Sequence, residues 1–384
     1  MNKENYKSYT FDNIVLFART GLNPRDNFKL GQGNNKYITI KNIQNNELII
    51  DKNTDVVDDE AIKLIHKRSQ IKKGDILFAS IGRIGDMYII QEEPKGWDIN
   101  ESVFAFTLNT KIVEQKYFYY IFKNQTTIDY LKNNSSGSTF KSIKMNQLKR
   151  MSFLLPSLEK QTKISQRLDK CNRIINHYKS IIEKYDMLIK SRFIEMFGEP
   201  VINSKNWQIK SIGDSCFVTK LAGFEYSKYI HYSDTGDVVM VKAQNVKNGK
   251  LNNKELSYIS NEVSNSLPRS QLAKNDVVMT YVGANIGDVA VIDDKYKYHL
   301  APNVAKIRPN VNIYNSDFLV QLLMMLRNYI VGNSADTAKA AIGMEKIRQL
   351  QLPIPPITLQ NEFASFIKQI DKSKFENESE EIAA

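Results

Sequence analysis

The sequence predicts an α+β protein with a pseudo-two-fold internal repeat, in which two similar mixed α/β domains are each followed by a helix. Three observations support this fold class. Five segments recur in the same order about 200 residues apart, short apolar runs alternate with turn residues in each half, and one long helical segment lies between the halves. We predict domains at residues 1–156 and 199–356, a central helix at 157–198, and a second, shorter helix at 357–384 with a polar, frayed tail.

The internal repeat rests on matched segments that keep their order and nearly the same offset. The pairs are Asp12 to Gly21 with Asp214 to Gly223, IKNIQNNELI from Ile40 with AQNVKNGKLN from Ala243, KKGDILFASIGRIGD from Lys72 with AKNDVVMTYVGANIGD from Ala273, STFKSI from Ser138 with DTAKAAI from Asp336, and LPSLEKQ ending at Gln161 with IPPITLQ ending at Gln360. A period of half the chain indicates tandem duplication of a whole domain plus its connector, and excludes a solenoid of short repeats.

The composition is that of a globular protein, and its net charge favours an anionic partner. The 384 residues are 42% hydrophobic and 25% charged, which is enough for two cores. The formal net charge of +11 favours a polyanion such as nucleic acid. A membrane surface is the alternative, but the basic residues are spread along the chain and are not gathered in one amphipathic helix.

The sequence also bears on the cellular compartment. It has no run of about 18 apolar residues, and its polar start lacks the apolar core of a signal peptide. We therefore expect a cytoplasmic protein. The two cysteines, Cys171 and Cys216, are too few and too far apart for a disulfide framework or a cysteine-based zinc cluster.

The central helix is predicted from a segment without Gly or Pro, Leu158 to about Phe197, which Gly198 and Pro200 end. Its apolar residues are alternately four and three apart, a heptad pattern typical of helix–helix packing. This packing seam contains Ile164, Leu168, Ile175, Tyr178, Ile182, Tyr185 and Ile189. A long core helix of a single domain is the alternative interpretation.

The second helix begins with the same pattern and then loses it. Its seam residues are Leu359, Phe363, Phe366 and Ile370. Ser373 and Asn377 occupy the next positions, and the acidic ending ENESEEIAA predicts fraying. The first helix therefore has a partner over only part of its length, and we expect the rest of its apolar face to meet another subunit.

No catalytic, metal or cofactor site is assigned to the chain. The four histidines are scattered without ligand spacing. The sequence has no GxSxG motif, no P-loop, and no Asn/Asp-Pro-Pro-aromatic tetrapeptide of the kind that adenine methyltransferases need. The carboxylates Asp58, Asp59 and Glu60 match a nuclease only in composition, and a solvated loop is the simpler interpretation.

Polar, basic and glycine-containing loops that occur in both halves are the candidate DNA contacts. Hydroxyls with a lysine suit phosphate contacts, while Arg, Asn and Gln read base edges. A plain turn between two strands is the alternative for each loop. The candidates are Lys41, Arg83, Ser138, Thr139, Lys141, Lys144, Gln244, Asn245, Asn285, Thr337 and Lys339.

The order of these motifs resembles the specificity subunit of Type I restriction–modification systems. The resemblance covers nearly the whole chain. It is carried by the domain-plus-helix repeat, the entry NWQIKSIGD at Trp207, the paired segments GSTFK and DTAKA, the helix entries LPSLEKQTKI and IPPITLQNEF, and the helix end LIKSRFIEMFGEP. Two features depart from the family pattern. The first half has SYTFDN in place of a Trp-led entry, and the second helix lacks a counterpart of IKSRFIEMFG.

The resemblance implies a division of labour among subunits. Two target-recognition domains each read one half of a split DNA site, and two antiparallel helices act as a spacer. Two modification subunits carry S-adenosylmethionine and methylate adenine. Restriction subunits use ATP and Mg²⁺ for translocation and cleavage. The specificity subunit binds double-stranded DNA and catalyses nothing. An enzyme with an unfamiliar site and a coiled-coil scaffold for other proteins are the alternatives.

The helix seam gives a prediction. We expect Ile175→Asp or Ile182→Asp to break helix packing, because each places an unpaired charge in an apolar contact. Thermal melting and partner-binding assays check this. The seam hypothesis is wrong if both variants melt and bind like the parent chain.

Overall fold

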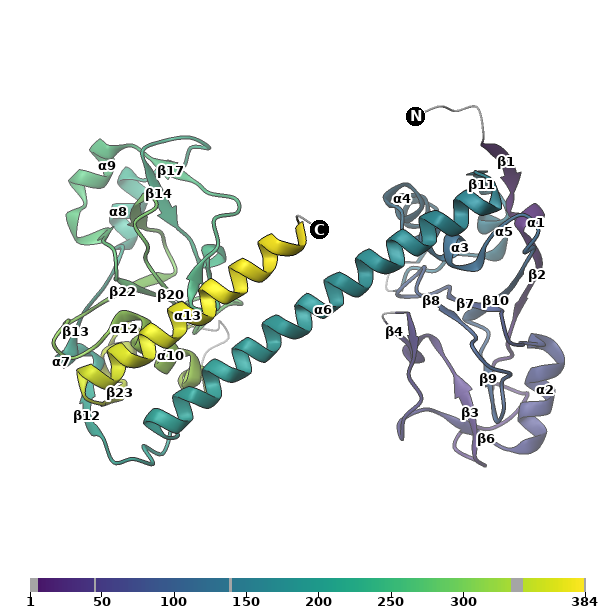
Figure 1. Ribbon diagram of the computed structural model, residues 1–384, viewed down its shortest axis with the longest axis horizontal. Coiled ribbons are helices and arrows are strands. Elements are labelled where there is room, and N and C mark those ends of the chain that lie inside the picture. Colours follow the sequence, from purple (N-terminus) through teal and green to yellow (C-terminus); the bar gives the residue numbers. More distant parts are fainter. Residues whose placement is uncertain (1–5, 45, 138–139, 333–340, 383–384) are drawn as a thin grey trace. The chain divides into compact units, whose positions relative to one another are not determined.

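The computed structural model describes residues 6–44, 46–137, 140–332 and 341–382, with side chains as far as residue 374. The chain divides into two compact units, Met1–Asn176 (unit 1) and His177–Ala384 (unit 2). The long helix α6 begins in unit 1 and ends in unit 2 (Figure 1).

Unit 1 is built on a four-stranded antiparallel sheet in the order β2-β10-β7-β8. A three-stranded sheet in the order β6-β3-β9 lies against it, and β1-β11 and β4-β5 form two small ladders. The strands are β1 (Lys7–Thr10), β2 (Val15–Thr20), β3 (Asn35–Ile38), β4 (Ile43–Gln44), β5 (Glu47–Leu48), β6 (Val56–Val57), β7 (Ile76–Ala79), β8 (Met87–Ile89), β9 (Trp97–Ile99), β10 (Val103–Leu108) and β11 (Ser152–Leu155). The helices are α1 (Phe11–Ile14), η2 (Ile40–Asn42), α2 (Asp59–Ser69), α3 (Gln115–Phe122), α4 (Gln125–Asn134) and α5 (Met145–Leu148).

The main sheet of unit 1 is covered on both faces, so its central strands are apolar throughout. In β7 all four residues are buried. Ile76 and Phe78 face α3, where the Phe78 ring lies 5.6 Å from the Phe122 ring. Leu77 points to the opposite face and packs with Ile38 and Ile99 of the second sheet. This two-residue alternation fixes the register, because a slip of one residue would exchange the two layers.

Unit 2 repeats this architecture. Its strands are β12 (Gln208–Ser211), β13 (Cys216–Lys220), β14 (Val238–Val241), β15 (Val246–Lys247), β16 (Lys250–Leu251), β17 (Tyr258–Ile259), β18 (Gln271–Leu272), β19 (Val277–Thr280), β20 (Val289–Val291), β21 (Lys297–Leu300), β22 (Val304–Pro309) and β23 (Gln351–Ile354). Its helices are α7 (Ile212–Ser215), α8 (Gly223–Tyr229), η3 (Ala243–Asn245), α9 (Asn261–Ser266), η4 (Pro268–Ser270), α10 (Ser316–Met325), α11 (Arg327–Gly332) and α12 (Met344–Gln349), and α13 (Ile357–Ile382) ends the chain.

The sheet topologies confirm the predicted fold class and its internal repeat. The sheet β13-β22-β19-β20 has the strand order of β2-β10-β7-β8, and β17-β14-β21 has that of β6-β3-β9. In unit 1, β3 pairs antiparallel with β6 and parallel with β9. In unit 2, β14 likewise pairs antiparallel with β17 and parallel with β21. Unit 2 adds β18 to this sheet.

A buried aspartate in each main sheet shows that the repeat is chemical as well as topological. Asp75 and Asp276 are both almost fully buried. Arg19 of β2 lies 2.7 Å from Asp75, whereas Arg308 of β22 holds Asp276 at 2.6 and 2.7 Å. The arginine thus comes from the edge strand in unit 1 and from its neighbour in unit 2. The matched segments around Lys72 and Ala273 therefore keep a buried ion pair, which is costly to break on one side only.

A buried glutamine joins each unit to the helix that follows it. In unit 1, Gln161 of α6 donates to the carbonyls of Ile112 and Pro156, both at 2.9 Å, and accepts the N–H of Glu114 at 3.0 Å. Glu114 is also the N-cap of α3. The same side chain therefore fixes the start of α6 to the start of the helix on the main sheet.

Unit 2 repeats this joint bond for bond. Gln360 of α13 donates to the carbonyls of Ile313 and Pro355 at 2.9 and 2.8 Å, and accepts the N–H of Asn315 at 2.9 Å. Asn315 caps α10 as Glu114 caps α3. Both glutamines have no exposed surface.

The predicted central helix is confirmed as α6 (Leu158–Phe197). In unit 2 its last turns pack antiparallel to α13. Phe193 lies 5.5 Å from Phe363 between ring centroids, while Asp186, earlier in α6, meets Lys374, later in α13, at 2.8 Å. The seam residues at this end are buried or partly buried: Tyr185, Ile189, Leu359, Phe363, Phe366 and Ile370.

The seam is not covered along the rest of α6. Ile164 and Tyr178 are half-buried, but Leu168, Ile175 and Ile182 are 38%, 49% and 39% exposed. Between Ile370 and Lys374, the last residue of α13 with a described side chain, the helix has only the polar residues Asp371, Lys372, Ser373 and Lys374. Ile175 and Ile182 are therefore not buried within the chain, so we expect their aspartate variants to leave its melting nearly unchanged. Their packing against another subunit stays a prediction.

The second helix, α13, extends into its polar tail, with a backbone that is helical as far as Ile382. The fraying of its end stays a prediction. The segment from Ile357 onward contains neither Gly nor Pro, and Glu and Lys are good helix formers even without an apolar partner. The loss of the apolar pattern thus ends the packing seam, but it does not end the helix.

The glutamine joint yields a stability prediction. We expect Gln161→Leu to destabilise unit 1 by about 1–3 kcal/mol, because it leaves one buried N–H and two carbonyls without partners. Urea unfolding measures the loss. The adjacent, exposed Thr162→Ala is the matched control and should leave the midpoint in place. Equal midpoints for the two variants would show that the joint contributes nothing.

Candidate DNA interface

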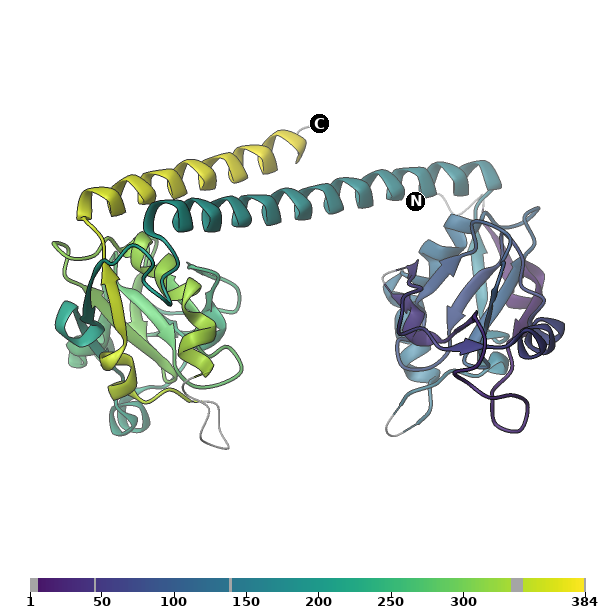
Figure 2. The same cartoon turned by 90° about the horizontal axis from the view of Figure 1, so that it is seen from below.

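Three separate segments of unit 1 that the sequence singled out are brought together. The loop 80–86 and the hairpin 135–144 are paired, with Gly82 donating to the carbonyl of Lys141 at 3.0 Å and Ile143 to that of Ser80 at 2.8 Å. The hairpin closes on itself through Ser136 and Ser142, which exchange bonds of 2.9 and 2.8 Å. It lies at the end of unit 1 away from α6 (Figure 2, steel blue).

Gly137 is required by the shape of this hairpin. Its φ of +120° lies in a region that L residues avoid, and an added Cβ would come within 2.2 Å of the Phe140 carbonyl oxygen. Phe140 itself is 72% exposed. The turn therefore presents an aromatic ring next to Lys141 at the tip of the loop.

Arg83 connects the third segment to the other two. Its guanidinium donates to the carbonyls of Ile40 and Ile43 at 3.2 and 3.0 Å, and pairs with Asp86 at 3.3 Å. The side chain is half exposed. Arg83 thus holds η2 against the loop 80–86, and this structural role occupies much of the donor capacity that sequence reasoning assigned to a base edge.

Three exposed lysines lie on this face. Lys41 on η2, Lys141 in the hairpin and Lys144 before α5 are all exposed. Lysine is a mobile point charge on a long stem, which suits contacts to a phosphate backbone better than readout of one base. The arrangement provides a basic rim on loops that the sheet holds in place.

Unit 2 builds the same face with different side chains. Ile342 donates to the carbonyl of Tyr281 at 2.8 Å, as Ile143 does to Ser80. Asp288, the counterpart of Asp86, is held by Arg327 of α11 at 2.9 Å. Asn285 is exposed in the loop 281–288, and Gln244 is exposed on η3, where it donates to Glu255 at 3.3 Å. Both amides face solvent, as a base-reading side chain must.

Asn245 does not fit the role predicted for it. The side chain is 2% exposed, and its amide donates to the carbonyls of Asn252 and Lys254 at 2.9 and 3.2 Å. Its counterpart Asn42 donates to the Ile49 carbonyl at 3.0 Å. The matched asparagines therefore hold the turn after η2 and η3, and neither is available to DNA. Four further candidates, Ser138, Thr139, Thr337 and Lys339, lie outside the described residues.

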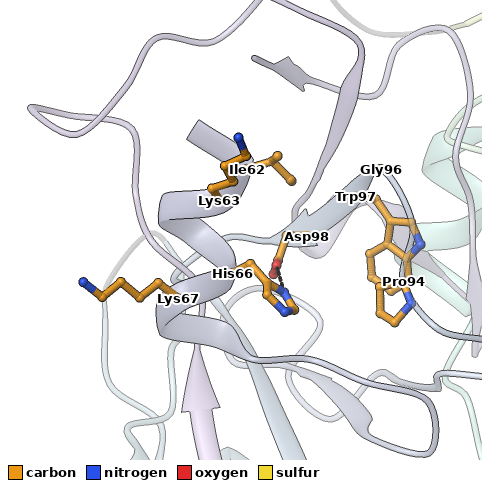
Figure 3. A pocket seen from close by; sticks show the side chains of 8 residues that line it. All are labelled: Ile62, Lys63, His66, Lys67, Pro94, Gly96, Trp97 and Asp98. Atoms are coloured by element: carbon orange, nitrogen blue, oxygen red, sulfur yellow. Dashed lines mark hydrogen bonds and ion pairs between the residues drawn. The ribbon is translucent and has the colours of Figure 1, made fainter. Parts of the chain in front are cut away.

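A shallow pocket lies beside α2 in unit 1 (Figure 3). His66 Nδ1 lies 3.0 Å from the buried carboxylate of Asp98. Burial raises the pKa of Asp98, while hydrogen bonds from Ser69, the Ile99 N–H and His66 act in the opposite direction. The pocket is lined by Ile62, Lys63, His66, Lys67, Pro94, Gly96, Trp97 and Asp98.

Metal binding and membrane insertion would each need a feature that can be checked in the described residues. Across the part of the chain with described coordinates, no three His, Cys, Asp or Glu side chains gather as a metal site would require. Within those same residues, none of the helices combines the length and apolarity needed to cross a bilayer.

Comparison with known proteins agrees with this architecture. The Type I restriction modification DNA specificity domain matches residues 3–184 and again residues 204–384. The chain is 25% identical over 367 residues to the Type I restriction enzyme MjaIX specificity subunit of Methanocaldococcus jannaschii, covering 91% of this chain and 82% of that protein. It is 20% identical over 301 residues to the Type I restriction enzyme EcoBI specificity subunit of Escherichia coli, covering 71% of this chain and 62% of that protein.

The fold comparison leads to the same class. The crystal structure of a Type-I restriction-modification system S subunit from M. genitalium is similar with a TM-score of 0.57 at 14% identity, covering 98% of this chain and 92% of that one. That structure therefore shares the fold of this chain, while the two family matches at residues 3–184 and 204–384 define a protein with two specificity domains. The chain belongs to the Type I restriction modification DNA specificity family, with one copy of the domain in each half.

The sequence analysis did not single out the glutamines that fix the two helix joints or the exposed Phe140 of the hairpin. Gln161 and Gln360 end matched segments, which is a usable signal, but a buried role for glutamine is rare enough that composition alone does not suggest it.

The basic rim yields a binding prediction. We expect Lys141→Ala or Lys41→Ala to weaken DNA binding and to lower the slope of log K against log salt by about 1, because each removes one phosphate contact. Fluorescence anisotropy with a mixed-sequence duplex measures the slope. Lys111→Ala is the control, since Lys111 is exposed beside the α6 joint. If all three variants share one slope, these lysines do not touch phosphate.

Proposed function

We propose that the chain is the sequence-reading subunit of a Type I restriction–modification complex. It binds a bipartite DNA site with two recognition units and positions methyltransferase and restriction subunits, while it catalyses no reaction itself. The observation that carries this proposal is the repeat of one reading unit, each copy with its own loop face and its own glutamine joint to a helix.

The repeat suits a split, asymmetric target. The two units share their scaffold but carry different side chains on matching loops, Arg83 and Lys41 against Asn285 and Gln244. Two readers on one chain with different contacts would select two different half-sites, whereas a symmetric dimer selects a palindrome. An α-helix of 40 residues between them would set the gap, since each residue adds about 1.5 Å.

The partners follow from the same proposal. Two modification subunits would supply S-adenosylmethionine and adenine methylation, and restriction subunits would supply the ATP- and Mg²⁺-dependent steps, all in the cytoplasm. The exposed stripe of Leu168, Ile175 and Ile182 on α6 supports an additional subunit, because an apolar stripe on a basic helix is costly in water. Association with modification subunits would bury it.

Methylome sequencing tests the proposal. Cells that express the chain with its modification subunit should show methylated adenine in one split motif with a fixed gap. A seven-residue helical insertion after Asn176 should keep both half-sites and lengthen the gap by about three base pairs, since two turns add about 10.5 Å and a base pair rises about 3.4 Å.

The controls separate the alternatives. Cells with the modification subunit alone should show no such motif. Methylation or cleavage of DNA by the purified chain alone would contradict a non-catalytic role. An insertion variant that keeps its half-sites and its original gap would contradict the helical spacer.

A further inference from the structure

The helix α8 of unit 2 exposes aromatic side chains, and it contributes no residue of its own to the core. None of its seven residues is buried. Phe224 is 73% exposed, Tyr229 is 37% exposed, and Tyr232 just after the helix is 42% exposed. In unit 1 the segment after Gly21 has instead a single aromatic, Phe28, which packs edge-on against Tyr37 at 5.5 Å. Between these two matching segments, the exposed aromatics therefore occur in the one that belongs to unit 2.

One side of α8 is fixed to the rest of unit 2 by an ion pair and an apolar contact. The orientation of its exposed side is therefore fixed as well. Glu225 accepts the N–H of Ala222 at 2.9 Å and pairs with Arg269 of η4 at 3.3 Å. Ile230, the next residue after the helix, is buried in the core under β14. Figure 1 shows α8 in this position, beside α9 and β14. A short helix held by its carboxylate and its C-terminal end keeps Phe224 in solvent.

Lysines surround the exposed rings. Lys228 follows Phe224 by four residues, so both occupy one face of the helix. Its ammonium lies 5.0 Å from the Tyr229 ring. The ammonium of Lys242 lies 5.8 Å from the Tyr232 ring. We call Phe224, Lys228, Tyr229, Tyr232 and Lys242 the α8 patch.

The α8 patch is continuous with the candidate interface of unit 2. Lys242 is the N-cap residue of η3, which carries Gln244. Burial raises the pKa of Tyr232 to about 12, with a further contribution from Tyr226, so this ring stays neutral and does not repel an anion. The occupant must therefore combine a flat apolar surface with negative charge, and DNA does so through its bases and phosphates.

We propose that Phe224 is a wedge that enters a base step of the duplex bound by unit 2, while Lys228 and Lys242 hold the flanking phosphates. The inference rests on the proposed DNA-reading function. A wedge unstacks one step and bends the duplex, at a cost that is lowest at flexible pyrimidine–purine steps. Unit 2 thus reads part of its half-site through deformability, at a step where no side chain needs to bond a base.

Base-unstacking fluorescence tests the wedge. The complex of the full chain with its modification subunit is bound to duplexes of the motif found by methylome sequencing, with 2-aminopurine placed at each adenine of the second half-site. We expect fluorescence to rise at one step with the parent chain. Phe224→Ala should abolish this rise and weaken binding about tenfold, as expected for one lost stacking contact. Phe224→Trp should retain both.

The matched control is Phe217→Ala, which removes a 52% exposed phenylalanine from β13 of the same unit and should change neither readout. Parent-like fluorescence and affinity for Phe224→Ala on a bound motif would overturn the wedge while leaving the DNA-reading function intact. Loss of modification-subunit binding in Phe224→Ala, with unchanged DNA fluorescence, would overturn it in favour of a protein-docking patch. Failure of the parent complex to bind any split motif would instead refute the proposed function.

Discussion

The buried glutamine at the first turn of each long helix is the interaction on which the arrangement depends. A helix that begins at the surface of a domain is free to pivot unless its end is fixed. Gln161 and Gln360 remove that freedom by bonding backbone groups on two sides of the joint, including the cap of the helix on the main sheet. Backbone partners do not depend on side-chain identity, so the joint survived while the units diverged.

The two units differ more in their loop side chains than in the apolar pattern of their main sheets. The main sheets keep a two-faced apolar pattern because any other pattern would leave one layer without a core. The loops at the far end of unit 1 are held by backbone bonds, which leaves their side chains free to change. Exposed side chains such as Lys141 and Asn285 can therefore change at little cost in stability, whereas Gly137 cannot, because its φ is +120°.

The sequence predicted the scaffold better than the site, and the reason is physical. Heptad spacing and the absence of Gly and Pro are local signals, and they located α6 correctly. Whether Ile175, Ile182 and Asn245 are exposed or buried depends on the residues that lie opposite them, and local sequence patterns do not record those neighbours. The loss of amphipathicity after Ile370 does not record how far α13 continues, and its backbone is helical as far as Ile382.

The two buried ion pairs restrict how such a protein can exchange parts. The guanidinium comes from β2 in unit 1 and from β22 in unit 2, with Thr107 and Thr219 in the vacated positions. A hybrid sheet made by recombination between these strands would give its aspartate either two arginines or none, and an unpaired buried carboxylate costs several kcal/mol. Viable crossovers must therefore fall outside the sheets. Recombination that changes specificity would then exchange a whole unit and leave each buried ion pair intact.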